Sequence, residues 1–153
     1  MQRTRILLAD DHEAVRAAIR NLLRKVPEYE VCGEAVDGKE TIEKAKGLRP
    51  DVILLDISFP DMSGLEVAPV IRKEVPDCGI LVVSQHDPEH MKPRVLRAGA
   101  HGFVSKASLS KGLLAAIRAL VASRSEPGWR PERRFCLFLN ATTKPNNGPR
   151  FFM

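Results

Sequence analysis

Cysteine is scarce in this sequence, and no cysteine motif is present. The three cysteines, Cys32, Cys78 and Cys136, are odd in number, widely spaced and without CxxC or Cys/His metal-ligand spacing. This pattern excludes a disulfide framework and a zinc site built on cysteine. We therefore interpret the cysteines as incidental reduced thiols, which are typical of a cytoplasmic protein.

Long hydrophobic segments are also missing. No run approaches the roughly 18 apolar residues that a membrane-spanning helix requires. Residues 1–5 lead into only four apolar residues before two acidic ones, so we expect neither a secretion signal nor a membrane partner. With 153 residues, of which 44% are hydrophobic and 28% charged, the chain has the size and composition of one globular domain.

Most of the chain carries little net charge. The formal net charge is +5, and residues 124–153 hold +4 of it through six basic and two acidic side chains, which leaves +1 for residues 1–123. Residues 1–123 therefore give no electrostatic reason to expect a nucleic-acid surface. Five of the eight aromatic residues also lie after Ser123. We place a domain boundary there and expect residues 124–153 to be a disordered tail or a truncated output region.

Short apolar runs alternate with helical patterns along residues 1–123. Uninterrupted apolar runs such as Val52–Leu55 are typical of strands covered on both faces of a parallel sheet. The expected strands lie at residues 6–9, 30–36, 52–55, 80–83 and 103–104, and a helical pattern follows each of them. This alternation predicts an α/β fold with a five-stranded, doubly wound parallel sheet of strand order 2-1-3-4-5, as in flavodoxin.

Capping residues and prolines set the expected limits of the helices. Asp11 precedes the first helical segment and is suited to cap it. Pro69 lies inside the third helix, expected over residues 63–74, and Pro93 lies inside the fourth helical segment. Because proline removes a backbone hydrogen bond, we expect a kink at Pro69 and an interruption at Pro93.

Polar residues follow four of the expected strands. They are Asp10 and Asp11 after the first strand, Asp56 after the third, Ser84 after the fourth and Lys106 after the fifth. In a sheet of this order the ends of the first and third strands meet where the chain reverses direction, so the three aspartates should converge on one crevice. Crowded carboxylates need a cation between them, and Mg²⁺ prefers such oxygen ligands. A carboxylate nucleophile, a metal ion, an ammonium group and a hydroxyl together fit phosphoryl transfer onto Asp56.

Residues 4–123, about four fifths of the chain, resemble the receiver domain of two-component response regulators, the CheY-like family. The resemblance rests on a set of residues in order and spacing: Asp10-Asp11, Asp56 followed by Pro60 and Gly64, Ser84, and Phe103 three residues before Lys106. Two segments, Asp10-Asp11-His12 and Ala98-Gly99-Ala100-His101-Gly102-Phe103, look most like receivers of the NarL/FixJ branch, the LuxR-type regulators.

The resemblance implies a role for each residue of the acidic crevice. Asp56 would accept a phosphoryl group from the phosphohistidine of a sensor histidine kinase or a phosphotransfer protein. Asp11, Asp56 and the backbone carbonyl of Ser58 would hold Mg²⁺, and Asp10 would contact it through water. Lys106 would pair with a phosphoryl oxygen.

The same resemblance implies a switch. Ser84 would move to hydrogen-bond the phosphoryl group, and Phe103 would turn inward into the space that Ser84 leaves. This movement would alter the surface of the fourth helix, fifth strand and fifth helix for partner binding or for a phosphorylation-dependent homodimer. Ser58 and His86, each two residues after a site residue, would govern the hydrolytic water, and we expect His86 to tune the phosphoryl lifetime with a pH dependence near neutrality.

Other function classes fit the residues less well. A haloacid-dehalogenase-like phosphatase would place a second acid two residues after the nucleophile, where this sequence has Ser58. A nucleotide- or flavin-binding module would have a glycine- or hydroxyl-rich loop after the first strand, where this sequence has Asp10-Asp11-His12-Glu13. A DNA-binding regulator needs a helix-turn-helix domain of several dozen residues, and residues 124–153 are too few.

We therefore expect a signalling switch whose only chemistry is its own Mg²⁺-dependent phosphorylation and dephosphorylation, not an enzyme with an external substrate. We expect no DNA binding from this chain. Two alternatives stay open: a transcription regulator remnant with a truncated DNA-binding domain, and a pseudo-receiver that acts as a binding module.

Overall fold

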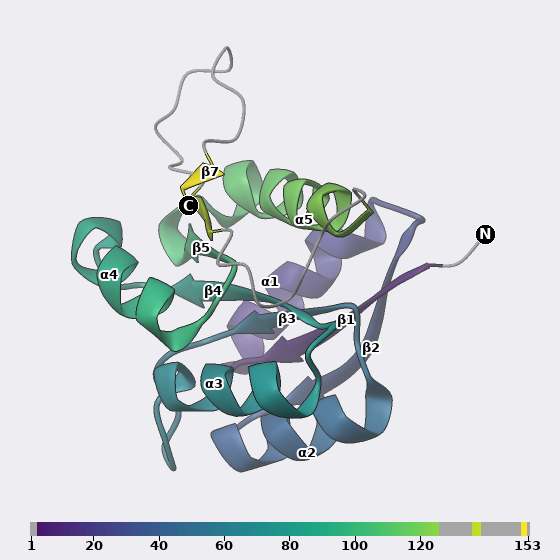
Figure 1. The fold of residues 1–153 in the computed structure, drawn as a ribbon. Coiled ribbons are helices and arrows are strands. Elements are labelled where there is room, and N and C mark those ends of the chain that lie inside the picture. Colours follow the sequence, from purple (N-terminus) through teal and green to yellow (C-terminus); the bar gives the residue numbers. More distant parts are fainter. Residues whose placement is uncertain (1–2, 126–135, 139–150, 153) are drawn as a thin grey trace.

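A computed structural model describes residues 3–125, 136–138 and 151–152 of the chain. Within these residues one sheet has the strand order β2-β1-β3-β4-β5-β6-β7 (Figure 1). The strands are β1 (Thr4–Ala9), β2 (Tyr29–Ala35), β3 (Val52–Leu55), β4 (Gly79–Ser84), β5 (Gly102–Ser105), β6 (Cys136–Phe138) and β7 (Phe151–Phe152). The first five strands pair in parallel in the order 2-1-3-4-5, which confirms the predicted α/β fold.

A helix follows each of the first five strands. These helices are α1 (Glu13–Arg24), α2 (Gly38–Leu48), α3 (Gly64–Glu74), α4 (Pro88–Ala98) and α5 (Leu109–Ser125), and a short 3-10 turn, η1 (Lys106–Ser108), precedes α5. Side-chain caps fix several of the helix starts. Asp37 caps α2, Asp87 caps α4, and Ser63 and Glu66 form a reciprocal capping box at α3.

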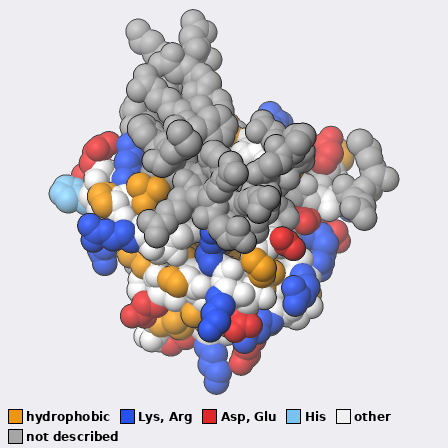
Figure 2. All heavy atoms as spheres, in the orientation of Figure 1, with side chains coloured by type: hydrophobic (Ala, Val, Ile, Leu, Met, Phe, Trp, Pro, Cys, Tyr) orange, Lys and Arg blue, Asp and Glu red, His pale blue; other side chains and the backbone are white. Residues whose placement is uncertain are grey.

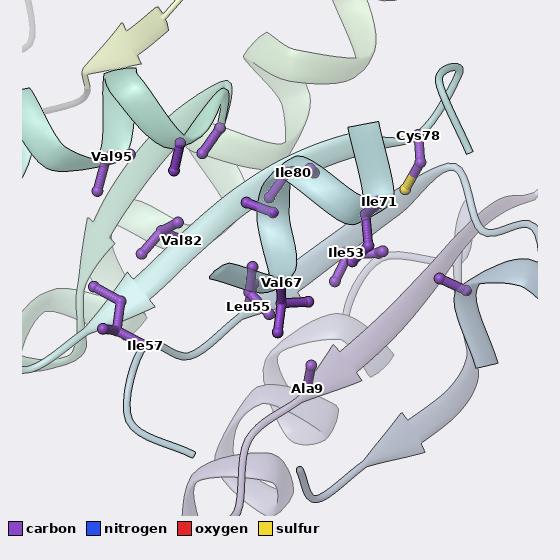
Figure 3. Close-up of a cluster of buried hydrophobic side chains, with 14 of the residues drawn as sticks. Ala9, Ile53, Leu55, Ile57, Val67, Ile71, Cys78, Ile80, Val82 and Val95 are labelled. Carbon is purple, nitrogen blue, oxygen red and sulfur yellow. The ribbon is translucent and has the colours of Figure 1, made fainter. Parts of the chain in front are cut away.

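The buried strands supply two cores because successive side chains on a strand point to opposite faces of the sheet. Ile53 and Leu55 of β3 face the side covered by α2, α3 and α4, where they pack with Val67 (Figure 3). Val52 and Leu54 face the other side, which α1 and α5 cover. All four side chains are at most 2% exposed, as the uninterrupted apolar run predicted.

Two expectations about the helices need correction. Asp11 does not cap α1: the N-cap residue is His12, its side chain makes no capping hydrogen bond, and the carboxylate of Asp11 contacts the His12 ring instead. Pro93 does not interrupt α4, and Pro69 lies inside an α3 that runs unbroken to Glu74. Each proline is the sixth residue of its helix, so only one intrahelical hydrogen bond is lost, and both rings are exposed.

Part of the segment after Ser123 is described. Helix α5 continues to Ser125, two residues past the expected boundary. Strand β6 pairs in parallel with the edge of β5, and β7 pairs antiparallel with β6, so the sheet extends beyond the five predicted strands. The expectation of a disordered tail concerns mainly residues 126–135 and 139–150, which lie outside the described residues.

One face of the described surface agrees with the charge distribution in the sequence. Figure 2 shows acidic and basic side chains mixed over the face formed by α2 and α3, with no large field of one sign. Val36 is the one large hydrophobic side chain that is exposed among the described residues. In the same part of the chain, no helix combines the length and apolar character that a membrane crossing requires.

Two glycines provide a matched test of the packing around the end of β3. A Cβ atom at Gly64, the first residue of α3, would lie 2.0 Å from the backbone oxygen of Asp56, whereas a Cβ at Gly47 in α2 would meet nothing within 4 Å. We predict that Gly64→Ala lowers the free energy of unfolding by about 1–3 kcal/mol, because the backbone must shift. Gly47→Ala should raise it by about 0.5–1 kcal/mol through helix propensity alone. Urea denaturation of both variants checks this, and equal effects would contradict it.

Candidate functional site

The pairing of β1 with β3 sets two aspartates side by side. The backbone N–H of Asp56 donates to the oxygen of Ala9 (2.9 Å), and the N–H of Asp10 donates to the oxygen of Ala35 (3.0 Å). The sheet ladder therefore continues to the residues that follow β1 and β3. Both carboxylates are buried, Asp10 at 4% and Asp56 at 3% exposed, at the carboxyl edge of the sheet.

Lys106 lies between these two carboxylates. Its Nζ is 2.8 Å from Oδ2 of Asp10 and 3.4 Å from Oδ1 of Asp56, and the three side chains are 4–7% exposed. Lys106 is positioned by η1, the short turn directly after β5, which the hydroxyl of Ser105 caps by accepting from the N–H of Ala107 (3.3 Å). One ammonium group thus faces two buried carboxylates, which leaves one negative charge without a buried countercharge.

This arrangement destabilises the ionised form of Asp56. Its Oδ1 accepts from the N–H of Ile57 (2.8 Å), whereas its Oδ2 is the one buried side-chain nitrogen or oxygen among the described residues that has no hydrogen-bond partner. Burial raises the pKa of Asp56 above its usual 3.8, and the charge of Asp10 adds to the rise; Lys106 opposes it. A buried, unsatisfied carboxylate oxygen is costly in the absence of a cation or a covalent partner.

Asp11 and His12 complete an oxygen-rich cluster. Nδ1 of His12 is 2.9 Å from Oδ1 of Asp11 and 3.2 Å from Oδ1 of Asp10. One potential ligand atom from each of Asp10, Asp11, His12 and Asp56 lies within 4.8 Å of the others. The three carboxylates and the unsatisfied oxygen of Asp56 fit a hard divalent cation such as Mg²⁺, whereas the imidazole of His12 is not a ligand that Mg²⁺ prefers.

A pocket of about 350 Å³ opens beside Asp56. Its lining residues are His12, Asp56, Ser58, Ser84, Gln85, His86 and Lys106. The structure therefore brings together Asp56, Ser58, Ser84, His86 and Lys106, as the sequence predicted. His12 and Gln85 were missed as pocket residues, although each is the sequence neighbour of a predicted one.

The two expected switch residues differ in their position. Ser84 is 1% exposed, lines the pocket, and its Oγ accepts from the N–H of His86 (3.1 Å). Phe103 pairs with Val82 in the sheet, is 3% exposed and belongs to the core cluster on the α4 side. Phe103 is thus a buried core residue in this structure.

Comparisons with known proteins agree with this geometry. The family described as the response regulator receiver domain matches residues 6–118. Response regulator protein VraR of Staphylococcus aureus is 36% identical over 128 residues, which is 84% of this chain and 60% of VraR. The chain thus spans about three fifths of the length of the curated relatives it matches.

Solved structures give the same result. The chain is 33% identical to a LuxR-family two-component response regulator from Aurantimonas, with a TM-score of 0.75 and coverage of 80% of this chain and 88% of the other. It is 32% identical to the receiver domain of the putative response regulator NarL from Mycobacterium tuberculosis, with a TM-score of 0.73 and coverage of 78% and 96%. With its strand order, its buried aspartates and its lysine after β5, the chain belongs to the response regulator receiver domain family.

Proposed function

We propose that this receiver is a phosphorylation switch in which Asp56 accepts a phosphoryl group in a Mg²⁺-dependent reaction. The donor would be the phosphohistidine of a sensor histidine kinase or a phosphotransfer protein. The observation that carries the proposal is the carboxylate of Asp56, which lines the pocket, has its Oδ1 3.4 Å from the ammonium group of Lys106 and leaves its buried Oδ2 without a hydrogen-bond partner. Such an oxygen is available as a nucleophile, and its burial cost falls when it gains a bond.

Each charged residue of the site would take part in this transfer. A carboxylate oxygen of Asp56 forms the new P–O bond as the P–N bond of the phosphohistidine breaks, and the released imidazole takes up a proton. Lys106 faces the phosphoryl oxygens with its ammonium group. Asp11 and Asp56, with the backbone carbonyl of Ser58, would hold Mg²⁺, and Asp10 would contact it through water; the ion would supply positive charge to the transferring group.

Transfer would change the hydrogen bonding of the pocket wall. Ser84 has a hydroxyl that can donate to a phosphoryl oxygen on Asp56, and its oxygen already accepts from the backbone of His86. A movement of Ser84 would therefore also move the start of the loop that leads into α4. This couples Asp56 to the surface of α4, β5 and α5 as a site for a partner or a second copy.

Strand β6 affects access to the surface of α4, β5 and α5. It occupies the edge of β5, where Gly102 and Phe103 pair with Leu137 and Phe138. A partner that binds across α4, β5 and α5 must therefore accommodate β6 or displace it.

We predict that incubation with acetyl phosphate and Mg²⁺ gives a single-phosphate adduct by intact mass spectrometry. The adduct should be absent in Asp56→Asn and absent when a chelator removes the metal. An unmodified protein with native circular dichroism would contradict the proposal and leave a pseudo-receiver that acts through binding alone. An adduct of equal yield in Asp56→Asn would place the acceptor elsewhere.

A second prediction concerns the phosphoryl lifetime. His86 and Ser58 are exposed residues that line the same pocket as Asp56, so both can contact the hydrolytic water. We expect His86→Ala to change the dephosphorylation rate by at least threefold, about 0.7 kcal/mol in activation free energy. The decay of the mass adduct measures this rate, with His90→Ala, another exposed histidine, as the matched control. An unchanged rate in His86→Ala would contradict the expectation.

A further inference from the structure

The carboxylate of Asp61 links the loop after Asp56 to the start of α2. Its Oδ1 accepts from the N–H of Gly38 (2.8 Å) and from the N–H of Met62 (2.9 Å), and its Oδ2 accepts from the N–H of Lys39 (2.9 Å). Gly38 and Lys39 are the first two residues of α2, 23 and 22 positions before Asp61. One side chain thus receives three backbone donors from two separate segments.

The start of α2 is a favourable place for this carboxylate. The first N–H groups of a helix have no intrahelical acceptor, and the helix dipole attracts negative charge there. The N–H groups of Gly38 and Lys39 hold the pKa of Asp61 below its usual 3.8. The regular N-cap residue, Asp37, is occupied with a different donor, the N–H of Glu40 (2.7 Å). Asp61 therefore satisfies donors that the helix's own cap does not reach.

Packing and backbone bonds close the rest of this loop. A Cβ at Gly38 would lie 2.2 Å from Cγ of Met62, so the absence of a side chain lets the loop approach α2. At the base of the loop, the N–H of Gly64 donates to the oxygen of Ile57 (2.8 Å), and Ser58 and Ser63 form an isolated bridge. The loop is closed at its base and held to α2 near its tip.

We propose that Asp61 is a positioning residue: by holding the loop to α2, it sets the backbone carbonyl of Ser58 for the divalent cation. This inference rests on the proposed function, in which Ser58 is one of the cation's ligands. It adds that the acidic pocket and the start of α2 form one connected unit, since the loop that carries Ser58 has its own anchor on that helix. Asp61 would act through Ser58 without touching the cation.

The test is a Mg²⁺ titration of the full chain followed by two-dimensional amide NMR. In the wild type, the Ile57 amide beside Asp56 and the Gly38 and Lys39 amides on Asp61 should shift with the same dissociation constant. Asp61→Ala should weaken Mg²⁺ binding about tenfold, the scale of residues that orient metal ligands, and the Gly38 amide should lose its response. Asp61→Asn keeps one acceptor oxygen, so its Mg²⁺ affinity should lie between those of the wild type and Asp61→Ala. The Asn variant also provides the test if Asp61→Ala fails to fold.

Asp37→Ala is the matched control. It removes a cap from the same helix without touching the loop, so it should lower the stability of α2 and keep the wild-type dissociation constant. Wild-type affinity in Asp61→Ala would overturn the positioning role and leave the proposed function intact. Equal weakening in Asp37→Ala would also overturn it, because helix stability would then explain the effect. No shift at Ile57 in the wild type would overturn the proposed Mg²⁺ chemistry and this role with it.

Discussion

The contact of Lys106 with Asp10 and Asp56 is the interaction on which the rest of the site depends. All three side chains are almost fully buried, and Nζ of Lys106 lies 2.8 Å from a carboxylate oxygen of Asp10 and 3.4 Å from one of Asp56. Lys106 lies closer to Asp10, at 2.8 Å, than to Asp56, so its ammonium group stabilises the charge of Asp10 more strongly. The pKa of Asp56 is raised, mainly by burial. The site is thus short of positive charge in a position that favours binding of a divalent cation.

The fold maintains this charge imbalance, because its backbone contacts keep the two carboxylates from moving apart. Backbone hydrogen bonds hold Asp10 to β2 and Asp56 to β1, so both side chains start from rigid strand ends. Gly64 packs against the backbone of Asp56 too closely for any side chain. Asp61 anchors the same loop to α2. The geometry around the acceptor is therefore determined by the main chain of several elements, which is how precise positioning of a reacting group is normally achieved.

Apolar runs and their spacing were sufficient to predict the five-stranded sheet and the aspartates at its edge, because parallel strands bring their carboxyl ends together whatever the details of the loops. Contacts made through space were not predictable. The bond between His12 and Asp11, which replaced the expected cap of α1, depends on side-chain directions that sequence spacing does not give. The unbroken helix at Pro93 reflects tertiary packing of Val95 and its neighbours, which outweighs one lost hydrogen bond. The strand β6 pairs with a segment more than thirty positions earlier, a separation at which local patterns carry no information.

The most direct measurement of the charge imbalance is the free energy of unfolding of the wild type and of Asp56→Asn between pH 3 and 8, without and with Mg²⁺. Because the pKa of Asp56 is raised in the folded state, ionisation of Asp56 should lower the stability of the wild type relative to the variant as pH rises from about 3.8 through the folded-state value. The variant should therefore be more stable near neutral pH, by about 1–3 kcal/mol, with the difference vanishing at the acid end and shrinking when Mg²⁺ is added. A variant that is no more stable than the wild type at pH 7, or one that gains as much from Mg²⁺, would contradict the account.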